Sequence, residues 1–215
     1  MSGGRLPGRP AEVNRLPPVA HLSDVTSIPA LDISPAGTRE LPAGTVERAA
    51  AGDKVAFARL IAAFHADLVR VAYVVCGDEE LAHDAAQSAW VIAWRKLGSV
   101  RDPARVRPWL ATVAANEARQ ALRGRRLETI TEINLDENEG ADSPAGDDPS
   151  DEIGRVDLAN ALRHLKPEDR SLLAMRFIVG LGAGEIAAAR GMTASGVRGH
   201  LSRVIDRLRK ELEDG

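Results

Sequence analysis

The sequence predicts an all-α protein built from two small helical domains that are joined by a flexible acidic linker. Three observations lead to this prediction. Aromatic residues make up only 3% of the 215 residues, whereas strands favour aromatic and β-branched side chains. Apolar residues recur at three- and four-residue spacing in two separate stretches, which is the pattern of helices with one buried face. The segment between these stretches is rich in Asp, Glu, Gly, Ser and Pro, a composition typical of a flexible spacer.

The charge is unevenly distributed and divides the chain into four segments. The net charge of −3 conceals a neutral, Pro- and Gly-rich segment at residues 1–45, which we expect to be disordered. Residues 46–126 carry a net charge of +4 and residues 153–215 one of +3. Residues 127–152 carry ten acids and no base. Two basic domains therefore flank an acidic linker, an asymmetry that the net charge alone hides.

The first domain, residues 46–126, is expected to contain three helices. The first has an apolar face from Phe57 to Val75 and ends at Gly77, and Asp78 is a plausible N-cap for the second, at about 78–97. The third starts near Pro108, because proline is tolerated in the first helical turn. The second helix has two apolar faces, of which one contains Trp90, Trp94 and Leu97. That additional face is either a surface for a partner or the sign of a helix central to its own bundle.

The second domain is expected to contain four helices. They span about 151–165, 167–179, 185–190 and a long last helix after Thr193, a suitable N-cap. The stretch 184–203, GEIAAARGMTASGVRGHLSR, has the layout of a helix-turn-helix. If Val197, Leu201 and Val204 face the core, the residues that point outward are Ser195, Arg198, Gly199, Ser202 and Arg203. Such positions enter the major groove of DNA, although a solvated amphipathic helix gives the same pattern.

Several kinds of chemistry are not expected. Cys76 is the only cysteine, so no internal disulfide can form, and its place in an apolar run predicts a buried thiol. The five histidines lie in separate segments, and no nucleophile, metal-ligand cluster or phosphate-binding loop is recognisable. No stretch has the length of an apolar membrane span. We therefore expect a cytoplasmic protein that is not an enzyme and needs no cofactor or metal.

Three motifs resemble the bacterial extracytoplasmic-function (ECF) sigma factors of RNA polymerase, a family with only the second and fourth sigma regions. The first is AHDAAQSAW at 82–90, and the second is WLATVAAN at 109–116, which a basic run follows. The third is GEIA at 184–187 together with SGVRGHLSRVIDRLRK at 195–210. The motifs extend over about three-quarters of the chain. The resemblance implies that 46–126 is a region 2-like domain and 153–215 a region 4-like helix-turn-helix domain.

The resemblance also implies functional roles. The chain would bind core RNA polymerase, direct initiation at promoters and act as an alternative, signal-responsive factor, with an anti-sigma factor as a candidate partner. The helix at 78–97 would dock on the clamp coiled coil of the largest subunit, through Asp84, Gln87, Trp90, Val91 and Trp94. The −10 promoter element would be held by Arg101, Arg105, Arg107, Asn116, Arg119 and Arg123. The −35 element would be read by Ser195, Gly196, Arg198, Gly199, His200, Ser202 and Arg203, in a domain that also sits on the flap of the second-largest subunit.

The sequence departs from the family where DNA specificity would be determined. The family usually has Gly-Thr-Val followed by Lys, Ser and Arg, whereas this chain has SGVRGH at 195–200. Gly196 and Gly199 each cost a helix roughly 1 kcal/mol relative to Ala, which suggests a close approach of the backbone to a partner. The −35 preference cannot therefore be transferred from relatives.

Two alternatives for the acidic linker remain open: it suppresses DNA binding by the free protein, or it is only a solvated spacer.

Two other classes of function are alternatives to the sigma factor role. A conventional helix-turn-helix regulator would dimerise on DNA half-sites and would not make core polymerase start at a promoter. A helical adaptor that binds only protein does not explain outward arginines on two separate helices.

Overall fold

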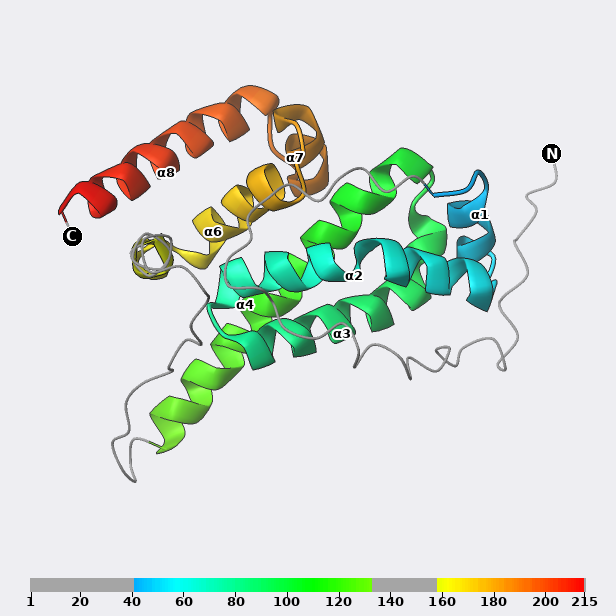
Figure 1. The fold of residues 1–215 in the computed structure, drawn as a ribbon, viewed down its shortest axis with the longest axis horizontal. Coiled ribbons are helices and arrows are strands. Elements are labelled where there is room, and N and C mark those ends of the chain that lie inside the picture. Colours follow the sequence, from blue (N-terminus) through cyan, green and yellow to red (C-terminus); the bar gives the residue numbers. More distant parts are fainter. Residues whose placement is uncertain (1–40, 133–157, 215) are drawn as a thin grey trace, which may run out of the picture.

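The computed structural model describes residues 41–132 and 158–214, and within these ranges all regular structure is helical (Figure 1). The all-α prediction is thus confirmed. The predicted disorder of residues 1–40, most of the acidic linker and the start of the helix expected at 151–165 lie outside the described residues.

Three long helices form the bundle of the first domain. The elements are α1 (Thr45–Ala50), α2 (Lys54–Cys76), α3 (Glu79–Lys96) and α4 (Val106–Glu132), with short 3-10 turns η3 (Leu97–Ser99) and η4 (Pro103–Arg105) before α4. Helices α2, α3 and α4 pack against one another. Gly77 ends α2 with a φ of 73°, a left-handed conformation that glycine adopts easily. The carboxylate of Asp78 accepts from the backbone N–H of Leu81 and caps α3 as predicted.

Both ends of this domain differ from the prediction. Thr45, which the composition places in the disordered segment, is buried, and its hydroxyl donates to the carbonyl of Pro42 at 2.6 Å. It begins α1, a helix that the apolar pattern does not predict. At the other end, α4 continues through residues 127–132, which the charge pattern assigns to the linker. This stretch contains neither Gly nor Pro, so no residue in it forces the helix to end.

The second apolar face of α3 is buried within the chain's own bundle. Trp90 and Trp94 are only 3% and 1% exposed, and their rings meet Phe57 of α2 edge-on, with centroids 5.7 and 4.9 Å away. The indole N–H of Trp90 donates to Nδ1 of His65 at 3.2 Å. Interpreting this face as a partner surface is therefore wrong, because α3 packs against both α2 and α4 and needs an apolar face for each. Cys76 is also buried, as expected, and burial raises the pKa of its thiol.

The second domain begins, within the described residues, with a helical stretch at 158–164. It continues with α6 (Pro167–Leu173), η5 (Ala174–Ile178), α7 (Ala183–Arg190) and α8 (Ala194–Asp214). The helix predicted for 167–179 is present, but its last turn, η5, is a wider π-helical turn. Val197, Leu201 and Val204 are buried on α8 as predicted, and the hydroxyl of Thr193 accepts from the N–H of Gly196 at 3.1 Å.

The two domains share one continuous hydrophobic cluster. Helix α6 and the turn η5 pack on α2, and α7 packs on both α4 and α8. Helix α8 runs along the outside of this assembly, away from α3 (Figure 1). The described residues therefore form a closed arrangement in which the second domain covers part of α2 and α4.

Candidate nucleic-acid and polymerase interfaces

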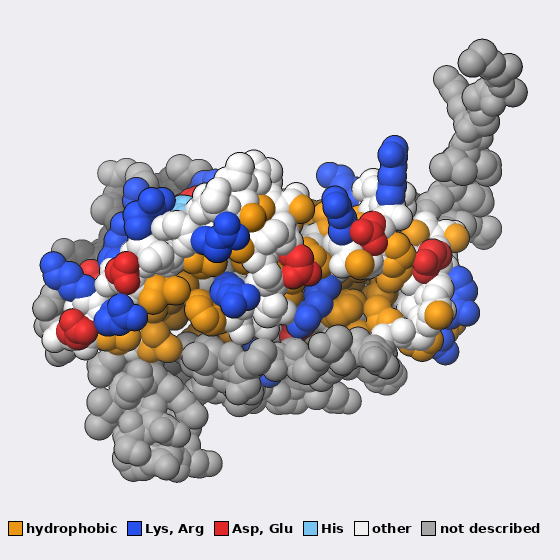
Figure 2. All heavy atoms as spheres, turned by 90° about the horizontal axis from the view of Figure 1, so that it is seen from above, with side chains coloured by type: hydrophobic (Ala, Val, Ile, Leu, Met, Phe, Trp, Pro, Cys, Tyr) orange, Lys and Arg blue, Asp and Glu red, His pale blue; other side chains and the backbone are white. Residues whose placement is uncertain are grey.

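The predicted −35 face of α8 is open to solvent. Ser195, Gly196, Arg198, Gly199, Ser202 and Arg203 are all exposed. They lie opposite the buried stripe because α8 turns 100° per residue and its apolar positions recur every three or four residues. Figure 2, a view from above, shows Lys and Arg side chains that stand apart from one another over this side of the molecule. Positive groups spaced along a solvent-facing surface are suited to contacts with phosphates and base edges.

The structure gives different reasons for the presence of glycine at positions 196 and 199 of this face. A Cβ atom on Gly196 would come within 3.0 Å of the Thr193 hydroxyl that caps the helix, so a larger residue would disturb the cap. A Cβ atom on Gly199 would meet no atom within 4 Å among the described residues. The fold therefore explains Gly196 internally, while Gly199 leaves room for a partner to approach the backbone.

His200, the remaining predicted −35 residue, is engaged within the fold. Its side chain is about one-third exposed, and its Nε2 lies 2.6 Å from Oδ1 of Asp169 on α6. Nη1 of Arg207, two turns further along α8, lies 3.3 Å from Oδ2 of the same carboxylate. In the sequence, Asp169 is only a favourable acid in the first turn of a helix, because spacing along the chain gives no signal of a contact between α6 and α8.

The predicted −10 residues on α4 are partly covered by the second domain. The guanidinium of Arg119 donates to the side-chain oxygen of Asn116 on the same helix. It also lies 3.6 Å from the carboxylate of Glu168 on α6. The side chain of Arg119 is only 19% exposed, whereas Arg123, one turn further on, is exposed. The centre of the predicted −10 face thus contacts protein in this closed arrangement.

A second arginine, Arg190, lies near the contact between Arg119 and Glu168. Burial lowers the pKa of Arg190 on α7, and the neighbouring positive charge of Arg119 lowers it further, while Glu168 acts in the opposite direction. The Nη1 atom of Arg190 is buried and has no hydrogen-bond partner among the described residues. Two like charges and an unsatisfied donor are unfavourable even in a partly buried contact. The sequence predicts neither Glu168 nor Arg190 as part of a site, since their proximity to Arg119 arises only from packing between domains.

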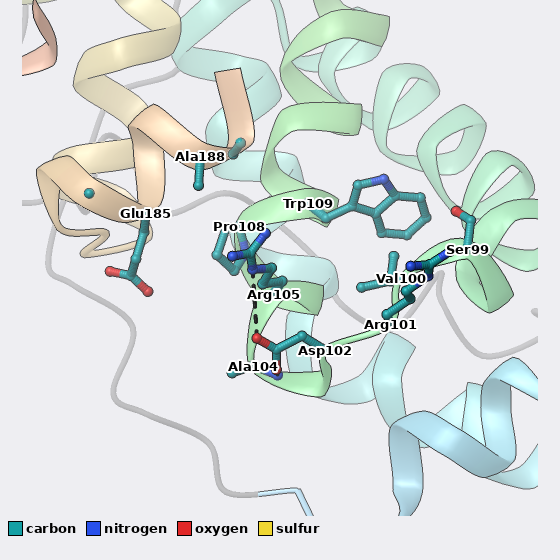
Figure 3. Close-up of a pocket in the computed structure, with 12 residues that line it drawn as sticks. Ser99, Val100, Arg101, Asp102, Ala104, Arg105, Pro108, Trp109, Glu185 and Ala188 are labelled. Atoms are coloured by element: carbon teal, nitrogen blue, oxygen red, sulfur yellow. Dashed lines mark hydrogen bonds and ion pairs between the residues drawn. The ribbon is translucent and has the colours of Figure 1, made fainter. Parts of the chain in front are cut away.

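The loop before α4 lines an open cavity of about 750 Å³ between the domains. Arg101, Arg105 and Trp109 line one side of it, and Glu185 and Ala188 of α7 line the other (Figure 3). Nε of Arg105 lies 3.6 Å from the carboxylate of Asp102. A cavity of this size with an aromatic ring and arginines at its rim can accommodate an unstacked base and its phosphate.

Arg107 differs from the other arginines of this loop region. Its guanidinium donates to the buried carboxylate of Asp67 on α2 at 3.4 Å. Loss of the guanidinium would remove one positive partner from a buried carboxylate, which is destabilising. The arginine predicted to hold DNA is therefore engaged in joining α2 to α4, and its loss would damage the fold as well as any DNA contact.

The predicted polymerase-binding residues of α3 separate into two groups. Trp90 and Trp94 belong to the core of the bundle. Asp84 and Gln87 are exposed and Val91 is half-buried, and their spacing of three and four residues places them on one helix face. This face is directed away from the core and is the part of the predicted docking helix that a partner can reach.

An apolar groove lies where the domains meet, with a volume of about 250 Å³. It is lined by Val74 of α2 together with residues of the second domain, among them Leu162, Leu173 and Leu208. Phe177 is also part of its wall and is 46% exposed. Exposed large apolar side chains next to an apolar groove are typical of protein-binding surfaces.

Neither a metal centre nor a membrane span is evident in the described parts of the chain. Residues 41–132 and 158–214 hold no group of three or more His, Cys, Asp or Glu side chains placed to bind a metal ion. Within the same ranges, no helix has both the length and the apolar character needed to cross a membrane.

Comparison with known proteins decides the family. Residues 60–128 match the family described as Sigma-70 region 2, and residues 155–208 match the one described as Sigma-70, region 4. The ECF RNA polymerase sigma factor BldN of Streptomyces coelicolor is 30% identical over 189 residues, which cover 86% of this chain and 70% of BldN. The chain belongs to the ECF sigma factor family. This sigma factor carries both regions in the order that its three sequence motifs indicated.

Solved structures have the same fold as this sigma factor. One, the structure of CnrH in complex with the cytosolic domain of CnrY, aligns with a TM-score of 0.58 at 25% identity and covers 79% of this chain and 96% of CnrH. Another, the sigma factor RpoE with the anti-sigma factor NepR from Bartonella quintana, aligns with a TM-score of 0.59 at 23% identity. It covers 73% of this chain and 96% of RpoE, and at this identity it shows the fold alone.

Proposed function

We propose that this ECF sigma factor directs core RNA polymerase to promoters by reading the −35 element with α8 and the −10 element with α4 and its preceding loop. Membership of the family supports the initiation role. The single observation that carries the assignment of surfaces is the exposed face of α8, where Arg198 and Arg203 stand beside small residues and are open to solvent. Small residues let the backbone approach the groove, and the arginines can reach guanine edges.

The −10 element is proposed to bind along α4 as a single strand. Asn116, Arg119 and Arg123 supply donors on the helix, and Arg101 and Arg105 supply positive charge at the cavity. The ring of Trp109 offers a stacking surface for an unpaired base. Because α7 and Glu168 occupy part of this surface in the closed arrangement, the second domain moves away from α4 when the strand binds.

Core polymerase is proposed to bind the exposed face of α3. Asp84 and Gln87 provide a charge and an amide that suit a polar helical partner, and we assign the clamp coiled coil of the largest subunit to this surface. The second domain would contact the flap of the second-largest subunit. The factor would work in the cytoplasm, where the polymerase is, as an alternative factor that responds to a signal.

An anti-sigma protein is proposed as a regulatory partner. The apolar groove at the junction of the domains suits the apolar face of an amphipathic helix. Since Val74 comes from the first domain and the other lining residues from the second, such a helix would hold the domains in the closed arrangement. The solved structure of RpoE, which has the same fold, contains the anti-sigma factor NepR as its partner.

Run-off transcription tests the proposed function. Purified core polymerase with the full chain and a genomic promoter library should yield transcripts with defined starts, and core polymerase alone should not. Asp84→Lys should abolish these transcripts, since it reverses the charge of the α3 face without entering the core. Glu47→Lys is the matched control because Glu47 is an exposed acid on α1. Transcripts that are equally abundant with both variants would contradict the α3 assignment, and the absence of transcripts with the wild type would contradict the function.

A further inference from the structure

The second domain contains a buried carboxylate that none of the proposed DNA-binding or polymerase-binding surfaces uses. Asp169, the third residue of α6, is 5% exposed and faces α8. Its two oxygens contact two different α8 side chains, His200 at 2.6 Å and Arg207 at 3.3 Å. An ionised carboxylate can only accept hydrogen bonds, so both α8 side chains act as donors to it. His200 and Arg207 are seven positions apart, so they lie two turns apart on the same side of α8.

The position of this contact on α8 determines what it can control. At 100° per residue, His200 and Arg207 lie at one edge of the buried stripe, whereas Arg198 and Ser202 lie on the opposite, outward side. The stripe itself consists of Val197, Leu201 and Val204. Apolar packing is non-directional, so it fixes the burial of α8 more firmly than its rotation. Charge-assisted hydrogen bonds are directional, and a pair of them two turns apart restrains rotation about the helix axis.

Apart from apolar packing, the first turns of α8 have few other polar restraints among the described residues. Gly196 and Gly199 contribute no side-chain packing, and the hydroxyl of Thr193 contacts the helix only at its N-terminus. Beyond Arg207, α8 makes a further polar contact to another helix through the exposed pair His164 and Glu211 near the C-terminus. The Asp169 carboxylate is therefore a buried polar restraint that joins α6 to the half of α8 that would read DNA.

We propose that Asp169 is a positioning residue for −35 recognition, because its carboxylate fixes the rotation of α8 and thereby selects which side chains meet the base edges. The inference rests on the proposed function of α8. It assigns no DNA contact to Asp169 itself, which acts through His200 and Arg207. Loss of the carboxylate changes the preference among −35 sequences, whereas loss of a phosphate contact weakens all sequences alike.

The test measures −35 preference with the full chain and core polymerase. A promoter library with randomised −35 positions and one fixed −10 element is transcribed, and sequencing of the transcripts gives the preferred motif. Asp169→Asn should reduce the ratio of preferred to average sequences on the order of tenfold, the discrimination of one good base contact. Asp169→Glu, which keeps the charge, should restore part of that ratio. Asp206→Asn is the matched control, because this exposed aspartate pairs with Arg209 of its own helix.

The outcomes separate the inference from the proposed function. If the wild type selects a −35 motif and Asp169→Asn selects the same motif with the same ratio, the inference is overturned and the function stands. If the wild type gives no transcripts, the function itself fails. Should Asp169→Asn unfold the second domain, Arg207→Gln removes one donor from a half-exposed position. This variant should flatten the motif in the same direction, and an unchanged motif with only uniformly weaker transcription would overturn the inference.

Discussion

The two proposed DNA-reading faces of this sigma factor differ in how much of the protein covers them. On α8 the reading residues are exposed, and the contacts that hold the helix lie behind them. On α4 the central residue, Arg119, contacts Glu168 and crowds Arg190, both from the second domain. The −35 face is thus ready to bind in the closed arrangement, whereas the −10 face must first lose protein contacts. Under the proposed function, domain separation would control the −10 contact and leave the −35 contact available.

The largest expected effect concerns the core on which both faces depend. Trp94→Ala should lower the free energy of unfolding by about 3–5 kcal/mol, because it removes a fully buried aromatic side chain. Since the two domains share one hydrophobic cluster, thermal unfolding followed by circular dichroism should show one transition at a lower temperature. Val55→Ala, at a site 65% exposed, should leave the transition unchanged. A separate transition that stayed at the wild-type temperature would show that the domains unfold independently.

The next effect tests the open face. Arg198→Ala should weaken binding of the free chain to a duplex −35 fragment by roughly 1–3 kcal/mol, if the guanidinium makes a bidentate contact with guanine. Because no domain movement is needed, polymerase holoenzyme should show the same loss. Fluorescence anisotropy measures both. Arg59→Ala, which removes an exposed arginine from α2, is the control, and equal losses for the two variants would indicate a general charge effect instead.

A smaller effect tests the covered face. Glu168→Gln removes the carboxylate beside Arg119 and leaves the repulsion between the guanidinium groups of Arg119 and Arg190 uncompensated. The pair is partly exposed, so its loss should cost less than about 1 kcal/mol. That is enough to raise the affinity of the free chain for a single-stranded −10 oligonucleotide severalfold. Glu47→Gln should have no such effect in the same titration. An unchanged affinity for Glu168→Gln would mean that the contact does not limit access to α4.

The smallest expected effect is a pH dependence of the melting temperature that comes from His65. His200 faces a carboxylate on the −35 side, whereas His65 accepts a hydrogen bond from Trp90 in the first domain. Burial, with a smaller contribution from His83, lowers the pKa of His65. A base with a folded pKa below its unfolded value of about 6.5 stabilises the fold above that pH and ceases to do so as the pH falls below it. The melting temperature should therefore fall between about pH 7 and about pH 5.

Replacement of His65 separates its titration from the titration of the other ionisable groups. His65→Gln should show a shallower decrease in melting temperature over the same pH range, even if the variant is less stable overall. Parallel curves for the wild type and the variant would show that His65 does not contribute to the acid sensitivity of the first domain.

The amino-acid sequence by itself determined most of the described helices, although not α1 or the last turns of α4, and it determined three helix ends and the resemblance to the family. Gly77, Asp78 and Thr193 mark helix ends through local chemistry, and the spacing of Val197, Leu201 and Val204 gives the buried side of α8. These features depend on residues within one or two helical turns, so local rules are sufficient to predict them.

Only the tertiary structure decided which apolar and charged side chains meet. It buried Trp90 and Trp94 in the bundle, although their spacing suited a partner surface equally well. It also brought Asp169 to His200 and Glu168 to Arg119 across distances of tens of residues along the chain. Such contacts arise from the relative placement of whole helices, which the shared hydrophobic cluster determines. A periodic pattern specifies that a face is buried, but it carries no information about the residues that cover it.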